Sequence, residues 1–222
     1  MAGTVVNEDN VVYKTLRKSI NKHGFRVRLD YVLKHGAGKE KHTAIRDIIK
    51  AVQGIPDEEL ASTIFVFFKN ELERAYAEME VSSYEGVEEL LSFLRERGVK
   101  LALNTGYDRN TAQLLLNKMN WKRGQHYDLL ITSDDVVLGR PNPDMIFEAM
   151  NFFGIEDPAL VLKAGDSIID IEEGKNAKCG ITVGVTTGAH TFQQLQSAEP
   201  TYVLKHLLHI KEIPGLNQLP IS

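Results

Sequence analysis

The sequence predicts an α/β fold, a doubly wound parallel sheet with a small helical cap near its N-terminus. After about residue 85, short apolar runs alternate with amphipathic helical patterns, which is typical of parallel strands covered by helices on both faces. Before that point the pattern is helical, with no convincing strand. A chain of 222 residues with 43% hydrophobic content is long enough for one ordinary domain and a smaller second one. We therefore expect a core domain at residues 1–10 and 85–222 and a cap domain at residues 11–84.

Three helices are expected in the cap. The clearest covers residues 56–79, where apolar side chains recur at three- and four-residue steps. It begins with Pro56 and three carboxylates, which favour the positive end of a helix dipole. Residues 13–23 and 42–53 also have helical patterns, and between them lies a glycine-bearing break from His35 to His42 with clustered positive charges.

The core begins with an amphipathic helix from Val87 that Gly98 ends. A buried strand is expected at residues 99–103, and Asp108 can cap the helix that follows it. Asn142 and Pro143 have the residue types of an N-cap and a first helical position. The remaining strands of the sheet are expected at residues 129–131, 160–162, 181–185 and 202–204.

Composition and charge exclude several classes of protein. The hydrophobic content is too high for a disordered chain, and a net charge of −4 argues against nucleic-acid binding by bulk charge. No apolar run approaches the roughly 20 residues that span a bilayer. A single cysteine, Cys179, cannot form an internal disulfide, so a cytoplasmic location is expected. The apolar residues 64–68 belong either to the core of the cap or to a homodimer contact.

Polar side chains follow the predicted strands at the points where those strands end. Thr105 follows the strand expected at 99–103, and Asp166 and Asp170 follow the strand expected at 160–162. Between these two strands, a Gly-Arg-Pro loop presents Arg140. Open parallel sheets bind ligands at the carboxyl ends of their strands. A hydroxyl, a guanidinium and two carboxylates suit a phosphoryl group bound together with Mg²⁺, which prefers hard oxygen ligands. The sequence thus indicates a site for a phosphorylated ligand and a magnesium ion.

Each of these residues also has a plainer interpretation. Thr105 is of a type that forms turns, Arg140 is of a type that forms surface ion pairs, and both aspartates can cap helices. The ordered set of three polar motifs at successive strand ends favours the functional interpretation.

This set resembles the haloacid dehalogenase superfamily, whose members mostly hydrolyse phosphate esters through an aspartyl-phosphate intermediate. The resemblance covers nearly the whole chain and implies a Rossmann-like core with an inserted helical cap. Three features look closest to the phosphonoacetaldehyde hydrolase (phosphonatase) branch. First, Ala2-Gly3-Thr4 matches the Asp-x-Ala-Gly-Thr opening of that branch. Second, position 140 is arginine, where most relatives have lysine. Third, the segment from Gly36 to His42 is similar to the Gly-x-x-Lys-x-x-His segment of the branch.

The resemblance implies a role for each of these residues. The cap lysine of the branch forms a Schiff base with the substrate aldehyde, which assigns that role to Lys39, and Lys41 and His42 beside it favour a lowered pKa. The Ala2 carbonyl and Asp166 would hold Mg²⁺, with Asp170 supporting the metal site. The residues implied to bind the substrate and its phosphoryl group are Gly3, His42, Thr105, Gly106, Tyr107 and Arg140.

The resemblance also places the nucleophilic aspartate of the family one residue before Met1, at the end of an apolar strand. The given chain contains neither, so the first core strand is expected to be missing. We expect the natural protein to begin about 10 residues earlier, which is enough for one strand.

A Mg²⁺-dependent phosphonatase-like hydrolase is the first functional hypothesis, with a small phosphonate or phosphorylated metabolite as substrate. Ala2 stands where phosphatases of the superfamily have an acid that protonates the leaving alkoxide. A carbon leaving group gains more from an iminium that accepts electrons. Two alternatives stay open at this point, a small-molecule phosphate-ester phosphatase and a non-catalytic protein that binds a phosphorylated ligand.

Overall fold

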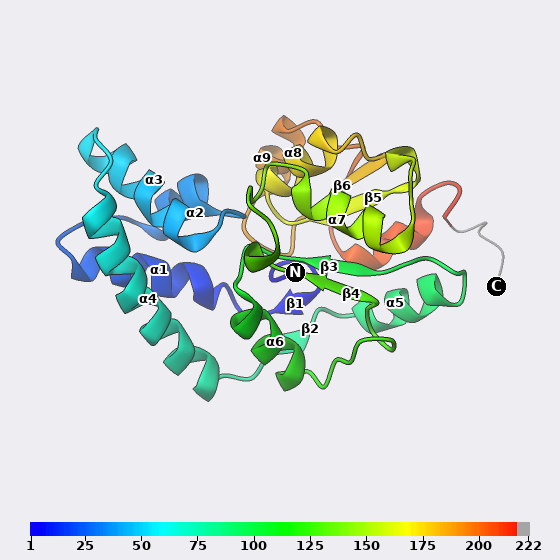
Figure 1. Cartoon of the computed structure of the whole chain (residues 1–222), viewed down its shortest axis with the longest axis horizontal. Coiled ribbons are helices and arrows are strands. Elements are labelled where there is room, and N and C mark those ends of the chain that lie inside the picture. Colours follow the sequence, from blue (N-terminus) through cyan, green and yellow to red (C-terminus); the bar gives the residue numbers. More distant parts are fainter. Residues whose placement is uncertain (217–222) are drawn as a thin grey trace.

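The computed structural model describes residues 1–216, and Figure 1 shows two groups of elements side by side. One group consists of four helices from the first third of the chain, and the other contains parallel strands with covering helices. The helices of the first group are α1 (Val11–Lys22), α2 (Leu29–Gly36), α3 (Lys41–Gln53) and α4 (Glu58–Glu78). We call these four helices the cap, and the division of the chain into two domains at residues 11 and 84 stays a prediction.

The cap helices pack around a shared apolar interior. Leu16, Ile45, Ile48 and Ile64 are completely buried there, and Ile64 belongs to the apolar face predicted for residues 56–79. Asp57 caps α4 by accepting a hydrogen bond from the backbone N–H of Leu60. Three of the four helices match the expected segments, and α2 is the addition. The apolar periodicity of α2 in the sequence is weak, because the helix has only eight residues and only two of them, Val32 and Gly36, are buried.

A short antiparallel pair joins the two segments that connect the cap to the rest of the chain. Strand β1 (Val6–Asn7) pairs with β2 (Ser82–Ser83), with Val6 opposite Ser83 and Asn7 opposite Ser82. The chain therefore enters and leaves the cap at the same place.

Parallel strands form the remainder of the fold, as the sequence predicted. Strand β3 (Ala102–Asn104) lies parallel to β4 (Leu129–Ile131). Strand β6 (Ile181–Val185) lies between β5 (Leu162–Gly165) and β7 (Tyr202–Leu204), again parallel to both. The accompanying helices are α5 (Val87–Arg95), α6 (Arg109–Lys118), α7 (Asp144–Phe153), α8 (Ile168–Asn176) and α9 (Phe192–Ser197), and the 3-10 turns are η1 (Ser133–Asp135), η2 (Pro158–Leu160) and η3 (Leu207–Glu212).

Three local predictions for the core were wrong. The strand expected at 99–103 begins only at Ala102 and extends to Asn104. The strand expected at 160–162 begins only at Leu162, because the Asp157 side chain accepts from the N–H of Ala159 and stabilises the 3-10 turn η2, leaving Leu160 77% exposed. Asn142 does not cap α7. Its amide donates to the carbonyl of Gly139 instead, and Pro143 occupies the N-cap position.

An apolar cavity lies between β3 and β5. These strands belong to separate hydrogen-bonded sheets in the described part of the chain, and the cavity beside them has a volume of about 480 Å³. Met1 lies at this cavity, and its amino group donates to the carbonyl of Asn104 at the end of β3. Figure 1 shows the N-terminus between the two sets of strands. The apolar side chains that line the cavity include Leu101, Leu103, Ile146, Met150, Val161 and Ala164.

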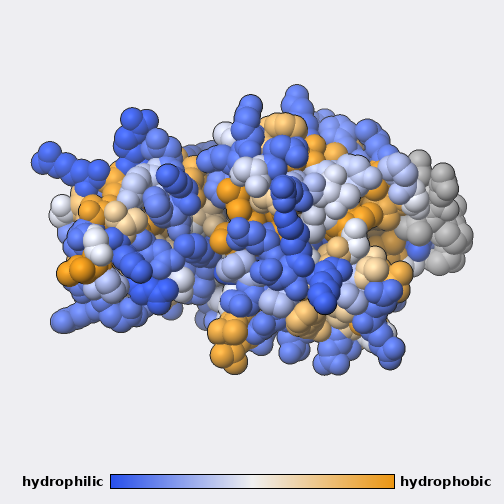
Figure 2. All heavy atoms as spheres, turned by 90° about the horizontal axis from the view of Figure 1, so that it is seen from above, coloured by the Kyte–Doolittle hydropathy of each residue, from blue (hydrophilic) through white to orange (hydrophobic). Residues whose placement is uncertain are grey.

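The surface is mainly polar. Figure 2 shows a face dominated by hydrophilic residues, with apolar ones scattered among them. The large exposed apolar residues come from distant parts of the chain, such as Val66 on α4 and Val137 after η1. No helix within residues 1–216 is both long enough and apolar enough to cross a membrane.

Candidate active site

A small enclosed pocket lies where the cap meets the ends of β3 and β5. Its volume is about 20 Å³, which is room for about one water molecule. The pocket is lined by Met1, Ala2, Tyr13, Gly38, Lys41, Thr105, Gly106, Tyr107, Arg140, Asp166 and Asp170. Most of the residues proposed from the sequence are among them.

Arg140 supplies a buried positive charge to this pocket. Its side chain is only 7% exposed and forms an ion pair with Asp170. The Nε atom of Arg140 is buried and has no hydrogen-bond partner among the described residues. A buried donor without a partner is rare in folded proteins and points to a ligand that completes it. Thr105 lies in the same pocket, and its Oγ1 accepts from the N–H of Tyr107, which leaves the hydroxyl proton free to donate.

The two aspartates of the pocket are held in different electrostatic surroundings. Asp166 accepts from the Thr4 hydroxyl at 3.1 Å and from the N–H of Ala189 at 2.8 Å. Burial raises the pKa of Asp166, and the nearby charge of Asp170 raises it further. Burial alone would raise the pKa of Asp170 too, but Arg140 and Lys163 outweigh it and hold this pKa well below its usual value. Asp170 is therefore a paired anion, whereas Asp166 forms no salt bridge with a side chain among residues 1–216.

Asp166 and the Ala2 carbonyl are suitable ligands for Mg²⁺. Both offer hard oxygen atoms, and Mg²⁺ typically takes only one or two carboxylates from a protein, with substrate oxygens and water completing its shell. Within residues 1–216, no group of three or more His, Cys, Asp and Glu side chains converges on a metal position. Gly3 permits the close approach of the first loop, because a Cβ atom there would collide with the carboxylate of Asp166.

Lys41 is the lysine that the structure brings into the pocket. Its side chain lies between the rings of Tyr13 and Tyr107, with Nζ 5.6 Å and 5.4 Å from the two ring centroids, and Nζ donates to the carbonyl of Lys39. Burial lowers the pKa of Lys41 to about 8, and the charge of Arg140 contributes to this. A substantial fraction of this amine is therefore neutral near physiological pH, as attack on a carbonyl requires.

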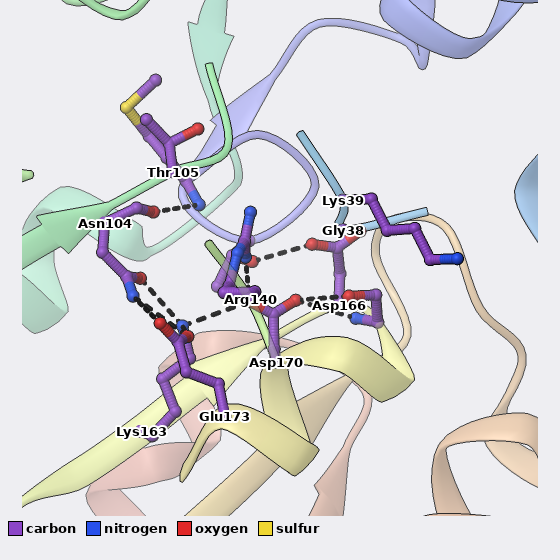
Figure 3. A network of polar contacts seen from close by, with 12 residues as sticks. Gly38, Lys39, Asn104, Thr105, Arg140, Lys163, Asp166, Asp170 and Glu173 are labelled. Carbon is purple, nitrogen blue, oxygen red and sulfur yellow. Dashed lines mark hydrogen bonds and ion pairs between the residues drawn. The ribbon is translucent and has the colours of Figure 1, made fainter. Parts of the chain in front are cut away.

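Lys39 and His42, which the sequence proposed for the site, lie elsewhere. The ammonium of Lys39 pairs with Asp47 at 2.7 Å, and Figure 3 shows the side chain pointing away from Arg140. The Nε2 atom of His42 lies 3.1 Å from the hydroxyl of Ser62, between α3 and α4. A sequence signal for Lys41 existed, because the spacing Gly-x-x-Lys also begins at Gly38 and ends at Lys41.

A second group of charges supports the pocket from below (Figure 3). The ammonium of Lys163 on β5 lies 2.8 Å from Glu173, 3.1 Å from Asp170 and 2.8 Å from the amide oxygen of Asn104. The amide nitrogen of Asn104 donates to both oxygens of Glu173. This network, which the sequence analysis missed, links the end of β3 to β5 and α8.

Comparison with known families identifies the class of protein to which this fold belongs. Residues 1–178 match the model of the haloacid dehalogenase-like hydrolases, so the chain belongs to this family. Within the family it is similar to the phosphonoacetaldehyde hydrolase branch. The phosphonoacetaldehyde hydrolase of Latilactobacillus sakei is 29% identical over 83% of this chain and 72% of that protein. The enzyme of the same name from Bacillus cereus is 38% identical over 47% of this chain, and the match spans 39% of its own length.

Solved structures have the same fold. A hydrolase from Pseudomonas syringae superposes with a TM-score of 0.83 at 20% identity, over 96% of this chain and 95% of that one. A phosphonoacetaldehyde hydrolase-like protein from Oleispira antarctica gives a TM-score of 0.81 at 22% identity, over 96% of this chain and 88% of that one. The predicted fold class and the predicted hydrolase family are thus both confirmed.

Proposed function

We propose that this chain is a Mg²⁺-dependent, phosphonatase-like hydrolase of the cytoplasm that acts on a small phosphonate, with phosphonoacetaldehyde as the first substrate to test. One observation carries the proposal. The same pocket holds a buried guanidinium with an unsatisfied donor, Arg140, and a buried amine with a lowered pKa, Lys41. The first group suits a phosphoryl anion and the second suits an aldehyde, which are the two functional groups of phosphonoacetaldehyde.

The phosphoryl group would be bound mainly by charge. The Nε atom of Arg140 and the hydroxyl of Thr105 donate to its oxygens, and charge-assisted bonds of this kind are about twice as strong as neutral ones. Asp166 and the Ala2 carbonyl would hold Mg²⁺, which offsets negative charge on the phosphoryl oxygens when bound.

Lys41 would activate the other end of the substrate. Its neutral amine attacks the aldehyde carbon, a C–N bond forms, and loss of water leaves a protonated imine. When a nucleophile attacks phosphorus, the C–P bond breaks and its electron pair moves into the imine, forming an enamine. Protonation of the enamine and hydrolysis of the C–N bond release acetaldehyde and return Lys41 as an amine.

An aspartate placed directly before Met1 would supply the nucleophile of this reaction. Its attack would form an aspartyl-phosphate, which water hydrolyses to inorganic phosphate. Ala2 supplies no acid for an alkoxide leaving group, so the alternative of phosphate-ester hydrolysis is the weaker one.

The test compares the given chain with a version that carries an apolar strand ending in aspartate before Met1. Phosphate release from phosphonoacetaldehyde is expected only from the extended version. In both versions, borohydride is expected to trap the substrate on Lys41, detected as a mass increase on its peptide, and Lys41→Arg should abolish trapping while Lys39→Arg retains it. Absence of both trapping and phosphate release would reject the proposal, and hydrolysis of phosphate esters without trapping would establish the phosphatase alternative. Phosphate binding without any turnover by the extended version would establish the non-catalytic alternative.

A further inference from the structure

Glu8 is a buried carboxylate outside the set of residues that would touch the substrate. Its side chain is 2% exposed, and it forms no salt bridge within the described part of the chain. Its Oε2 accepts from the N–H of Val12 at 3.0 Å and from the hydroxyl of Tyr76 at 3.1 Å. A buried carboxylate without a cation partner costs free energy, so its presence in the core requires an explanation.

Glu8 begins a chain of hydrogen bonds that ends at the pocket. The hydroxyl of Tyr76 lies 2.9 Å from the hydroxyl of Tyr107, and their rings meet edge to face. These three residues come from different parts of the molecule, namely the segment that enters the cap, helix α4, and the loop that follows β3. The chain of bonds therefore links the cap to the core beside the proposed site.

The last member of the chain, Tyr107, forms one wall around Lys41. Its ring centroid lies 5.4 Å from the Lys41 ammonium, and Tyr13 forms the opposite wall at 5.6 Å. The hydroxyl of Tyr13 accepts from the N–H of Gly38, which fixes the loop before α3. With Tyr107 anchored through Tyr76 to Glu8, neither wall of the lysine site can rotate freely.

The charge of Glu8 also acts on Lys41. Burial raises the pKa of Glu8 to about 7, although the bonds from Val12 and Tyr76 oppose this. The titratable groups that face Glu8 are Tyr76 on α4, Tyr13 on α1, Tyr84 after β2, Tyr107 on the core loop, Asp166 and Lys41. The positive charge of Lys41 stabilises the carboxylate of Glu8. By reciprocity, an ionised Glu8 stabilises the ammonium form of Lys41, and a neutral one does not.

We infer that Glu8 is a positioning residue, which acts on Lys41 through the hydrogen-bonded chain of Tyr76 and Tyr107 and through its own charge. This inference deepens the proposed function, since it concerns the same lysine. It makes two separable claims, one about the charge of Glu8 and one about the hydrogen-bonded chain that begins at it.

Two single substitutions in the 222-residue chain distinguish the effect of the Glu8 charge from that of the hydrogen-bonded chain. Glu8→Gln retains an oxygen that can accept from Val12 and Tyr76 but removes the charge. Tyr76→Phe retains the ring but interrupts the hydrogen-bonded chain. Glu148→Gln, an exposed substitution on α7, is the matched control for loss of a carboxylate.

The readout is the rate at which acetic anhydride acetylates Lys41, measured by mass spectrometry across pH 6 to 10 without any substrate. Glu8→Gln is expected to move the midpoint of this profile to lower pH by about 0.5 to 1 unit, because loss of a negative charge lowers the pKa of an ammonium. Tyr76→Phe is expected to change the rate at every pH and to slow borohydride trapping of phosphonoacetaldehyde severalfold, while the dissociation constant for inorganic phosphate stays the same. The control should coincide with the unchanged chain.

If Glu8→Gln and Tyr76→Phe both give the profile of the unchanged chain, the inference is overturned. Should Glu8→Gln fail to fold, the profile of Tyr76→Phe alone decides, since that variant retains the charge and the ring. A shifted acetylation profile in a chain that traps no aldehyde would retain the inference about Glu8 and reject the proposed substrate. The two proposals therefore fail on different measurements.

Discussion

The ammonium of Lys163 lies 2.8 Å from the carboxylate of Glu173, and both groups are almost completely buried. This ion pair joins β5 to α8 directly beneath the proposed phosphoryl site. Lys163 also contacts Asp170 of the same helix, so it shares that carboxylate with Arg140. The pair therefore helps to hold Asp170 in place as the partner of Arg140.

The first prediction concerns this pair. Lys163→Met leaves Glu173 without its cation in the interior, and breaking a buried ion pair from one side typically costs about 3–5 kcal/mol. We expect a loss of this size in the free energy of unfolding, measured with urea. Lys175→Met removes an exposed pair with Glu199 and should cost less than about 1 kcal/mol. Equal losses in the two variants would contradict the role given to Lys163.

The second prediction concerns the free donor of Arg140. Arg140→Lys preserves a positive charge near Asp170 but removes the Nε donor, and a hydrogen bond to a charged group contributes about 1.5–3 kcal/mol. Binding of inorganic phosphate, measured by calorimetry, should weaken about 10- to 100-fold. Arg109→Lys, at an exposed ion pair with Asp135, is the control and should bind phosphate as before. An unchanged dissociation constant for Arg140→Lys would exclude the Nε atom as a phosphoryl ligand.

The third prediction follows from the raised pKa of Glu8. Burial raises this pKa from 4.5 to about 7, so the folded state holds a proton that the unfolded state releases between these values. The corresponding stabilisation is fully present below pH 4.5 and is lost as the pH rises through 7, by up to about 3 kcal/mol. Glu8→Gln removes this dependence. Between pH 5 and 7, the free energy of unfolding should therefore fall more steeply for the unchanged chain than for the variant, and parallel curves would contradict the raised pKa.

The fourth prediction concerns the cavity between β3 and β5. An apolar segment of strand-forming residues placed before Met1 is expected to occupy it, because it pairs with both strands and removes apolar side chains from water. Each well-buried aliphatic side chain contributes about 1.5–3 kcal/mol, so we expect the free energy of unfolding to rise by at least about 2 kcal/mol. A glycine- and serine-rich segment of equal length is the control. If both segments change stability equally, the cavity does not accept a strand.

The convergence of residues at the ends of the parallel strands could be predicted from the sequence. Thr105, Arg140, Asp166 and Asp170 lie in one pocket because parallel strands deliver the residues after them to the same edge of a sheet. Such a convergence follows from topology alone, so the order of motifs along the chain was sufficient to predict it.

The contribution of the cap could not be predicted in the same way. Lys39 and Lys41 are two residues apart, and which of them enters the pocket depends on the start of α3. The Glu40 side chain accepts from the N–H groups of His42 and Thr43, so that the helix begins at Lys41 and presents this side chain to the core. The chain from Glu8 to Tyr107 has no local pattern at all, since its members lie 68 and 31 residues apart and meet only after the cap has packed on the core.

The pairing of β1 with β2 has a consequence for which substrates can enter. Both segments that connect the cap to the core pass through this one ladder, which has two residues on each strand. A rotation of the cap relative to the core would therefore pivot at this ladder. Such a rotation would move the far ends of the cap helices much further than Glu8, because Glu8 directly follows β1. If the cap turns to admit a substrate, we expect the four residues of this ladder to set the angle, so a substitution at Val6 or Ser83 is expected to change substrate selectivity without changing any residue of the pocket.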